Sequence, residues 1–216
     1  MTLKVIKKSP KYIIGIDEVG RGPLAGRVFV GAVCLSEKNN NILKKNYQQK
    51  IDKLKVLNHL ADSKKLTEKQ RNEWFLWIKK NKVSYATSAI SPKIIDKINI
   101  SQASNKAAQI ALGKLIKKNK IGLASIVTDA GIKIKTGFSF KSFPKADETV
   151  PVVSLASIVA KVTRDKEMVK FHKKHPLYGF DENKGYGTKN HICAIKKHGP
   201  SPIHRLTFIK KLNRIN

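Results

Sequence analysis

Acidic side chains are scarce in this sequence, and four of them stand where apolar segments end. There are 15 Asp and Glu residues against 44 Lys and Arg among 216 residues. Asp17 and Glu18 follow the apolar run YIIGI, Asp129 closes SIVT, and Asp147 lies in PKADETV, just before a helical pattern. A carboxylate buried at a strand end is costly unless it is paired or binds a cation. Because oxygen-only ligands favour Mg²⁺ or Mn²⁺, these acids indicate a divalent-metal site.

Asp17 and Glu18 are neighbours in the chain, which restricts how both could reach one metal. Consecutive residues of a regular strand point to opposite faces, so they could share a site only where the strand breaks up. We expect that break at the glycine-rich stretch that follows, with Asp17 as the principal ligand and Glu18 as a peripheral one. The alternative is that the two acids flank a turn, that Asp129 caps the next segment and that Asp147 is solvated in a loop.

The formal net charge of +29 narrows the class of partner. A field of this strength attracts polyanions, and nucleic acid is the first to consider. A compositional bias towards Lys, Ile and Asn could explain part of the excess, and an acidic membrane surface would also attract the chain. The longest apolar run, residues 28–35, is shorter than the ~20 residues that span a bilayer. With two cysteines and no secretory signal, we expect a cytoplasmic monomer without membrane association.

Apolar periodicity predicts the elements that must position the acids. Strands are expected at 12–17, 28–35, 83–90, 123–128 and 138–143, and helices from Thr67 through 78, after Ser91, and at 101–118 and 154–170. The first two strands should be antiparallel. Because strands come early and then alternate with helices, the predicted fold is α/β with a mixed sheet. Residues 36–58 should be a solvated insertion with a helical stretch. We expect a catalytic domain over 1–171 and, packed on it, a basic C-terminal extension over 172–216 with two short helical stretches.

Five segments, in order, resemble the motifs of the ribonuclease HII family of bacteria and archaea. They are IDEVGRGPLAG at 16–26, DSKKL at 62–66, KAD to VVSLASIVAKVTRD at 145–165, KGYGT at 184–188 and HGPSPIHRLTF at 198–208. The resemblance covers almost the whole chain. It implies a ribonuclease H-like mixed sheet flanked by helices. It also implies a catalytic and metal-binding set of Asp17, Glu18, Asp129 and Asp147.

Two details refine the resemblance, one about the set of acids and one about the family. Asp165 lies in the third motif, but the nearby Lys161 and Arg164 favour a structural role for it over that of fourth ligand. The sister family, ribonuclease HIII, is disfavoured because few residues precede Asp17 and because the fourth acid is Asp147, not Glu.

The activity that the resemblance implies is endonucleolytic. Such an enzyme hydrolyses the phosphodiester 5′ of a ribonucleotide, in RNA–DNA hybrids and at single ribonucleotides embedded in duplex DNA, and leaves a 3′-hydroxyl and a 5′-phosphate. The implied cofactors are two divalent cations, Mg²⁺ or Mn²⁺. In that scheme Asp17 bridges both ions, Asp129 and Glu18 complete the shell of one, and Asp147 that of the other.

The resemblance also assigns substrate contacts. Glycines let backbone atoms approach a ribose closely, and the 2′-hydroxyl is the group that separates RNA from DNA. Stacking on a neighbouring deoxyribose would favour cutting at RNA–DNA junctions. The implied contacts are Gly20, Arg21 and Gly22 at the ribose and its phosphate, Tyr186 on the neighbouring sugar, and Ser63, Lys64 and Lys65 on backbone phosphates. The residues alone are also consistent with structural roles: a strained turn at 20–22, a packed side chain at Tyr186 and a solvated loop at 63–65.

Some positions depart from the family pattern. Asn183 stands where His is usual, which puts a substrate contact or the local packing in doubt. Leu155 replaces a small residue and requires space in the core, and Ala130 replaces a common Gly. His191, His198 and His204 lack metal-ligand spacing and are expected to be structural or to face phosphates.

Two other functions compete with this interpretation. A non-catalytic basic RNA-binding module would need only the charge, but the acids would repel its ligand. Another nuclease of the same fold, such as a resolvase or transposase, would need no sensor for a 2′-hydroxyl.

Overall fold

The structure is a computed structural model that describes residues 11–36, 39, 43 and 66–212. Residues 211 and 212 are described by their backbone alone. Most of the expected insertion at 36–58 lies outside the described residues. The same holds for Ser63, Lys64 and Lys65.

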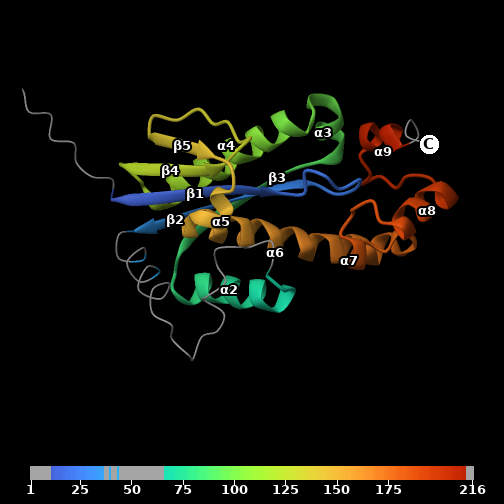
Figure 1. The fold of residues 1–216 in the computed structure, drawn as a ribbon, viewed down its shortest axis with the longest axis horizontal. Coiled ribbons are helices and arrows are strands. Elements are labelled where there is room, and N and C mark those ends of the chain that lie inside the picture. The colour runs from blue at the N-terminus through green and yellow to red at the C-terminus, as the bar shows by residue number, and fades with distance from the viewer. Residues whose placement is uncertain (1–10, 37–38, 40–42, 44–65, 213–216) are drawn as a thin grey trace, which may run out of the picture.

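In the described part of the chain, five strands form one sheet in the order β3-β2-β1-β4-β5 (Figure 1). The strands are β1 (Tyr12–Val19), β2 (Val28–Ser36), β3 (Ser84–Ile90), β4 (Ala124–Asp129) and β5 (Ser139–Phe143). β1, β2 and β3 pair antiparallel, whereas β1, β4 and β5 pair parallel. The predicted mixed sheet is therefore confirmed, including the antiparallel first pair.

Helices cover both faces of this sheet (Figure 1). α2 (Glu68–Lys80) and the long α6 (Pro151–Lys174) lie on one face, and α3 (Pro92–Ile98) and α4 (Ile100–Asn119) on the other. Thr67 caps α2 as predicted: its hydroxyl accepts from the backbone N of Gln70, whose side chain in turn accepts from the backbone N of Thr67. This reciprocal pair satisfies two donors that a helix start otherwise leaves free.

Alternation along β2 divides the core into two layers. Val30 and Ala32 face the layer under α4, whereas Val33 and Leu35 face the layer under α6 and α2. Leu155 on α6 is fully buried in the second layer, so the core provides the space that it needs.

Two strand glycines let α6 approach the sheet backbone. A Cβ on Gly15 would lie 2.3 Å from the carbonyl of Val152, and a Cβ on Gly31 would lie 2.3 Å from the carbonyl oxygen of Ala156. Real side-chain carbons do not come that close, so only glycine fits at either place. The position of α6 along β1 and β2 is thereby fixed.

The C-terminal region contains more helix than expected. It holds α8 (Lys189–His198) and α9 (Leu206–Leu212), and also a 3₁₀ turn η2 (Pro176–Tyr178) and the short α7 (Phe180–Asn183). α6 ends at Lys174, and Met168 near its end packs with Tyr178 and Phe180 in a third apolar cluster. Leu24 and Ala25, from the connection between β1 and β2, belong to the same cluster.

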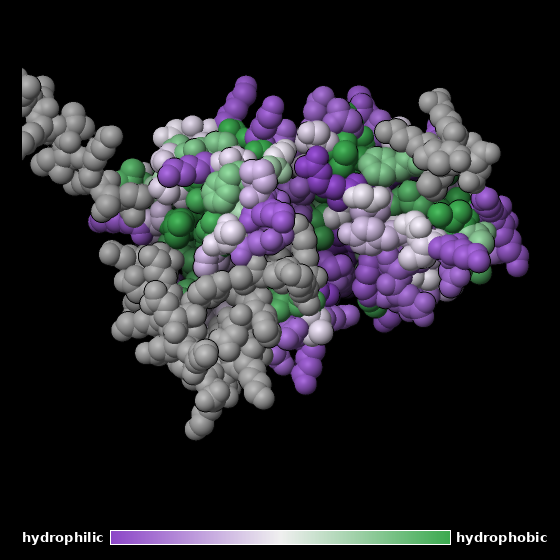
Figure 2. Space-filling model, viewed as in Figure 1, coloured by the Kyte–Doolittle hydropathy of each residue, from purple (hydrophilic) through white to green (hydrophobic). Residues whose placement is uncertain are grey.

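Hydrophilic side chains project around the α8–α9 end and along the upper edge of the face in Figure 2. No helix among the described residues is long and apolar enough to cross a membrane.

Candidate active site

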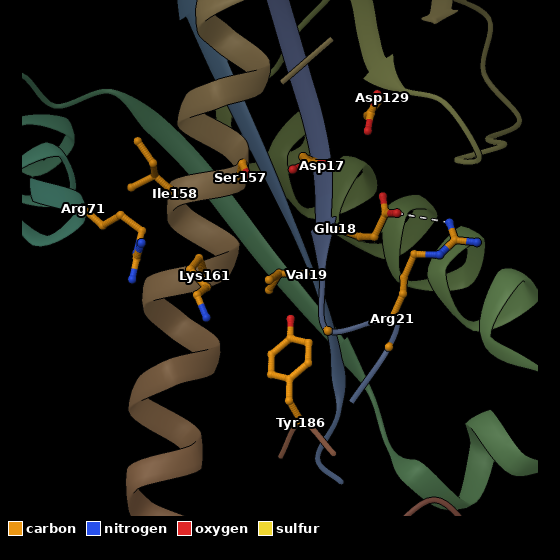
Figure 3. Close-up of a pocket in the computed structure, with 12 residues that line it drawn as sticks. Asp17, Glu18, Val19, Arg21, Arg71, Asp129, Ser157, Ile158, Lys161 and Tyr186 are labelled. Carbon is orange, nitrogen blue, oxygen red and sulfur yellow. Dashed lines mark hydrogen bonds and ion pairs between the residues drawn. The ribbon is translucent and has the colours of Figure 1, made fainter. Parts of the chain in front are cut away.

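A cavity of about 420 Å³ opens at the C-terminal end of β1, between the sheet and α6 (Figure 3). It brings together three of the four predicted acids, the 20–22 turn and Tyr186. Its lining is Asp17, Glu18, Val19, Gly20, Arg21, Gly22, Arg71, Asp129, Ser157, Ile158, Lys161 and Tyr186. Segments far apart in the sequence therefore meet at the place where the acids cluster. We call this space the candidate cavity.

The ending of the sheet explains how both Asp17 and Glu18 reach the candidate cavity. β1 continues past Asp17, with its pairing to β2 running to Val19, and it ends at the glycine-rich stretch where the break was expected. On the other side, however, its pairing with β4 ends at Ile16. Beyond that point β1 has a neighbour on one side only. The two side chains keep their opposite directions, with Asp17 towards Ser157 and Glu18 towards the side of Asp129 (Figure 3).

Asp17 is 4% exposed, and its environment disfavours a negative charge. Burial raises the pKa of its carboxyl group well above the ordinary value, and the charges of Glu18 and Asp147 raise it further. A hydrogen bond from Ser157 acts in the opposite direction but is outweighed. An anion in this position would be stabilised by a bound cation.

Glu18 has one satisfied and one unsatisfied carboxylate oxygen. Oε1 accepts a hydrogen bond from Nη1 of Arg21 at 3.1 Å, whereas Oε2 is buried without a hydrogen-bond partner among the described residues. Burial raises the pKa of Glu18, partly offset by Arg21. A buried oxygen without a hydrogen-bond partner costs free energy, and binding a cation would offset this cost, so Oε2 suits the role of a cation ligand.

Asp129 and Asp147 are linked through the start of α5 (Ala146–Thr149). Oδ1 of Asp129 accepts from the backbone N of Ala146 at 3.2 Å, which ties the end of β4 to that helix. Asp147 is fully buried and does not line the candidate cavity, although its charge reaches Asp17. Within the described ranges, no three side chains of His, Cys, Asp or Glu form a group ready to hold a metal ion.

Arg205, which sequence reasoning did not single out, binds the backbone of the 20–22 turn through its side chain. Its guanidinium donates to the carbonyls of Gly20 at 2.7 Å, Arg21 at 2.9 Å and Gly26 at 3.0 Å. Burial lowers the pKa of Arg205 to about 9. A planar fork of donors suits three carbonyls at fixed places, and Lys could not replace it.

Arg164 connects the same turn with the KGYGT segment. It donates to the carbonyls of Lys184 at 2.8 Å and Ala25 at 3.3 Å. A Cβ on Gly20, whose φ is +90°, would lie 2.4 Å from Nε of Arg164. The turn therefore needs glycine for its backbone conformation and for the close approach of Arg164.

Tyr186 projects its ring into the candidate cavity and is 41% exposed (Figure 3). Asn183 shapes the backbone before it: Oδ1 accepts from the backbone N of Gly185 at 2.7 Å, and Nδ2 donates to the carbonyl of Tyr178 at 2.6 Å. The departure at position 183 is thus absorbed by local backbone contacts.

Sequence reasoning missed the basic wall of the candidate cavity. Arg71 of α2 and Lys161 of α6 lie across it from Glu18 and Asp129 (Figure 3). Lys161 pairs with Asp165 at 2.9 Å, and Asp165 does not line the candidate cavity. Lys161 follows Ser157 by four residues and so shares its helix face, a spacing visible in the sequence.

The mixed sheet with helices on both faces and acids at the ends of β1 and β4 defines the class of ribonuclease H-like nucleases. The family model described as Ribonuclease HII matches residues 14–211. A ribonuclease HII of Caldicellulosiruptor bescii is 38% identical over 97% of this chain and 92% of its own length. The chain belongs to the ribonuclease HII family.

Solved structures share the fold. The crystal structure of ribonuclease H2 from Pyrococcus horikoshii OT3 is similar with a TM-score of 0.68 and 27% identity, covering 94% of this chain and 98% of that one. Bst ribonuclease HIII in complex with Mn²⁺ shares the fold with a TM-score of 0.71 at 19% identity, covering 97% of this chain and 71% of that one.

Proposed function

We propose that the protein is an endonuclease that hydrolyses the phosphodiester 5′ of a ribonucleotide, leaving a 3′-hydroxyl and a 5′-phosphate. Its substrates are RNA–DNA hybrids and duplex DNA with single embedded ribonucleotides. One observation carries this proposal: the candidate cavity contains both the acids Asp17, Glu18 and Asp129 and the 20–22 turn. The acids supply a site for phosphodiester chemistry, and the turn supplies backbone atoms close enough to test a sugar.

We further propose that Asp17, Glu18, Asp129 and Asp147 hold two divalent cations, Mg²⁺ or Mn²⁺. The residues fit such ions because their oxygens are hard ligands and because Oε2 of Glu18 lacks a partner. When bound, the pair of ions would lower the pKa of an attacking water and stabilise the leaving oxygen. The Mn²⁺ complex of the Bst ribonuclease HIII supports a divalent ion at this fold.

Recognition of the ribonucleotide depends on a turn whose shape is set before substrate binds. Arg205 fixes the carbonyls of Gly20 and Arg21, so the backbone of the turn need not reorganise around a ribose. Arg21 is held by Glu18 and is 38% exposed, which leaves its outer face for the adjacent phosphate. Tyr186 stacks on the neighbouring sugar and favours a deoxyribose there.

Backbone phosphates would meet basic groups around the candidate cavity. We propose Ser63, Lys64 and Lys65 as phosphate contacts from the second motif, and Arg71 and Lys161 as contacts from the basic wall. Their charges offset the repulsion that the acids exert on a polyanion.

The remaining proposals concern the whole chain. We propose a monomer of the cytoplasm, with a catalytic domain over 1–171 and a C-terminal extension over 172–216. Cys34 is buried and Cys193 exposed, both without a disulfide, which suits a reducing compartment. The contact of Met168 with Tyr178 and Phe180 supports an extension packed tightly on the domain.

A comparison of two duplexes tests the proposed function. One is DNA with a single ribonucleotide and the other is the same sequence in DNA alone, each incubated with Mg²⁺, Mn²⁺ or a chelator. We expect cleavage only of the first, only with metal, and on the 5′ side of the ribonucleotide. Cleavage of both would indicate another nuclease of this fold, and binding without cleavage would indicate an RNA-binding module.

A further inference from the structure

We propose that His191 and His204 are positioning residues for Tyr186, acting through a relay of hydrogen bonds in which each imidazole keeps one tautomer. The relay begins at the backbone of Ser201 and ends at the backbone of Tyr186. This inference rests on the proposed function, because it deepens the role of Tyr186 in selecting the sugar.

Three contacts form the relay. The backbone N of Ser201 donates to Nδ1 of His204 at 2.8 Å. Nε2 of His204 lies 3.0 Å from Nε2 of His191. Nδ1 of His191 lies 2.8 Å from the carbonyl oxygen of Tyr186. Residues from the KGYGT segment, α8 and the HGPSPIHRLTF segment are thereby joined in one line.

The two ends of the line decide where the protons are. A backbone N–H can only donate, so Nδ1 of His204 accepts and its proton sits on Nε2. That proton is donated to Nε2 of His191, which must be bare. The proton of His191 is then on Nδ1 and is donated to the carbonyl of Tyr186, which can only accept. One pair of neutral tautomers satisfies all three contacts.

The surroundings favour the neutral form of both rings. His191 is fully buried and His204 is 3% exposed. Tyr178 packs against His204 with ring centroids 4.9 Å apart, and Phe180 against His191 at 5.4 Å. Burial lowers the pKa of His191, and it lowers that of His204 to about 4, helped by His191 and His175. A second proton on His191 would place two donors face to face between the histidines, and a second proton on His204 would face the backbone N–H of Ser201.

Tyr186 is held by backbone hydrogen bonds, to which the relay adds a side-chain contact: its backbone N donates to the carbonyl of Asn183 at 2.9 Å, and its carbonyl accepts from the backbone N of Thr188 at 2.8 Å. It stands between Gly185, whose φ is +83°, and Gly187, residues that permit many backbone conformations. Its ring must meet a sugar at a fixed height in the candidate cavity. His191 contacts the same carbonyl as the backbone N of Thr188, and together the two contacts fix the direction from which the side chain of Tyr186 leaves the backbone.

Nitrogen NMR of the full-length protein tests the relay without any variant. Long-range proton–nitrogen spectra assign the protonated nitrogen of each histidine near neutral pH. We expect the proton on Nε2 of His204 and on Nδ1 of His191. Any other pair of tautomers, or an averaged signal at either ring, would overturn the relay.

Variants test its effect on selection. The readout is the ratio of kcat/KM for a single ribonucleotide followed by deoxyribose to that for a continuous RNA strand paired with DNA. We expect His204→Leu to lower this ratio about tenfold, and His204→Gln, whose amide can replace the Nε2–H donor, to keep it within about threefold. His198→Gln, an exposed histidine at the end of α8, is the matched control and should leave the ratio unchanged.

A double variant separates positioning from a general loss of structure. If His204 acts through Tyr186, Tyr186→Ala lowers the ratio and His204→Leu lowers it no further in that background. Independent, additive losses would overturn the inference while the function of Tyr186 stands. An unchanged ratio in Tyr186→Ala would overturn both. If His204→Leu fails to fold, the ratio measured for His204→Gln and the tautomers assigned by NMR still test the relay.

Discussion

Arg205 donates from Nη2 to the carbonyl of Gly20 at 2.7 Å, across 185 residues of chain. Gly20 lies near the start of the sequence and lines the candidate cavity, whereas Arg205 belongs to the last of the five motifs, at 198–208. The backbone of the 20–22 turn is therefore completed only when the C-terminal region has packed. This contact makes the extension part of the site and not an appendage to it.

Arg205→Lys should reduce both stability and turnover. A single ammonium cannot replace three donors to Gly20, Arg21 and Gly26, and unsatisfied buried carbonyls follow. We expect a loss of about 2–4 kcal/mol in the free energy of unfolding, measured with urea, and a lower kcat/KM on a ribonucleotide-containing duplex. Arg27→Lys is the control, since the side chain of Arg27 is 46% exposed and pairs with Glu167. Equal effects of both variants would contradict the role of Arg205.

Gly31→Ala should destabilise the sheet beneath α6. Its new Cβ would lie 2.3 Å from the carbonyl oxygen of Ala156, so strand or helix must shift. We expect a loss of about 2–4 kcal/mol in the free energy of unfolding. Gly113→Ala in α4 meets nothing within 4 Å and should instead gain about 0.5–1 kcal/mol. A neutral Gly31→Ala would show that α6 is not held at that distance.

Acid should weaken the protein through His204. Burial lowers the pKa of this histidine from 6.5 to about 4, so between these values the unfolded chain binds the proton more readily. The stability that the neutral ring contributes is complete above pH 6.5 and is lost as pH falls towards about 4. We expect a loss of about 1–3 kcal/mol over this window.

Urea unfolding of the wild type and of His204→Gln at a series of pH values measures that loss. The variant cannot titrate at this position, so its stability should fall less steeply. The buried acids Asp17 and Glu18, whose raised pKa values act in the opposite direction, contribute equally to both proteins. Parallel pH profiles would exclude His204 as the source.

Divalent cations should raise the thermal stability of the free protein. Asp17 and Glu18 are buried beside each other, and their mutual repulsion is relieved by a bound ion. Scanning calorimetry with Mg²⁺ or Mn²⁺ should show a higher Tm than with a chelator. In Asp17→Asn the response should disappear, whereas Asp181→Asn, an acid outside the candidate cavity, should keep it. An undiminished response in Asp17→Asn would place the ions elsewhere.

Local patterns were sufficient to predict most of the fold. The apolar run at 28–35 and the cap at Thr67 are short-range signals, and both elements formed as predicted. The strand expected at 12–17 continues to Val19, because pairing with β2 outlasts pairing with β4 and no local signal records this. The contact of Met168 with Tyr178 and Phe180 joins segments on the two sides of the expected boundary at 171, which stays a prediction.

The candidate site was predictable where a residue acts by its own type. Asp17, Glu18 and Asp129 were suggested by acids that end apolar runs, and they line one cavity. Arg205 and the histidine pair act through contacts between distant segments, so their spacing in the chain contained no signal. Whether Asp147 joins the other acids around a cation is a prediction that still requires its experiment.

The most direct measurement compares wild type and Asp17→Asn on duplex DNA with one labelled ribonucleotide in Mg²⁺. Binding is followed by fluorescence anisotropy, and cleavage by single-turnover kinetics on the same samples. Asp17 is buried in the candidate cavity and should serve the cations and not the docking of the duplex. We predict affinity within about threefold of wild type and cleavage lower by at least about a thousandfold. Retained cleavage in Asp17→Asn would contradict the assignment of the metal-binding acids, and with it the account of the site.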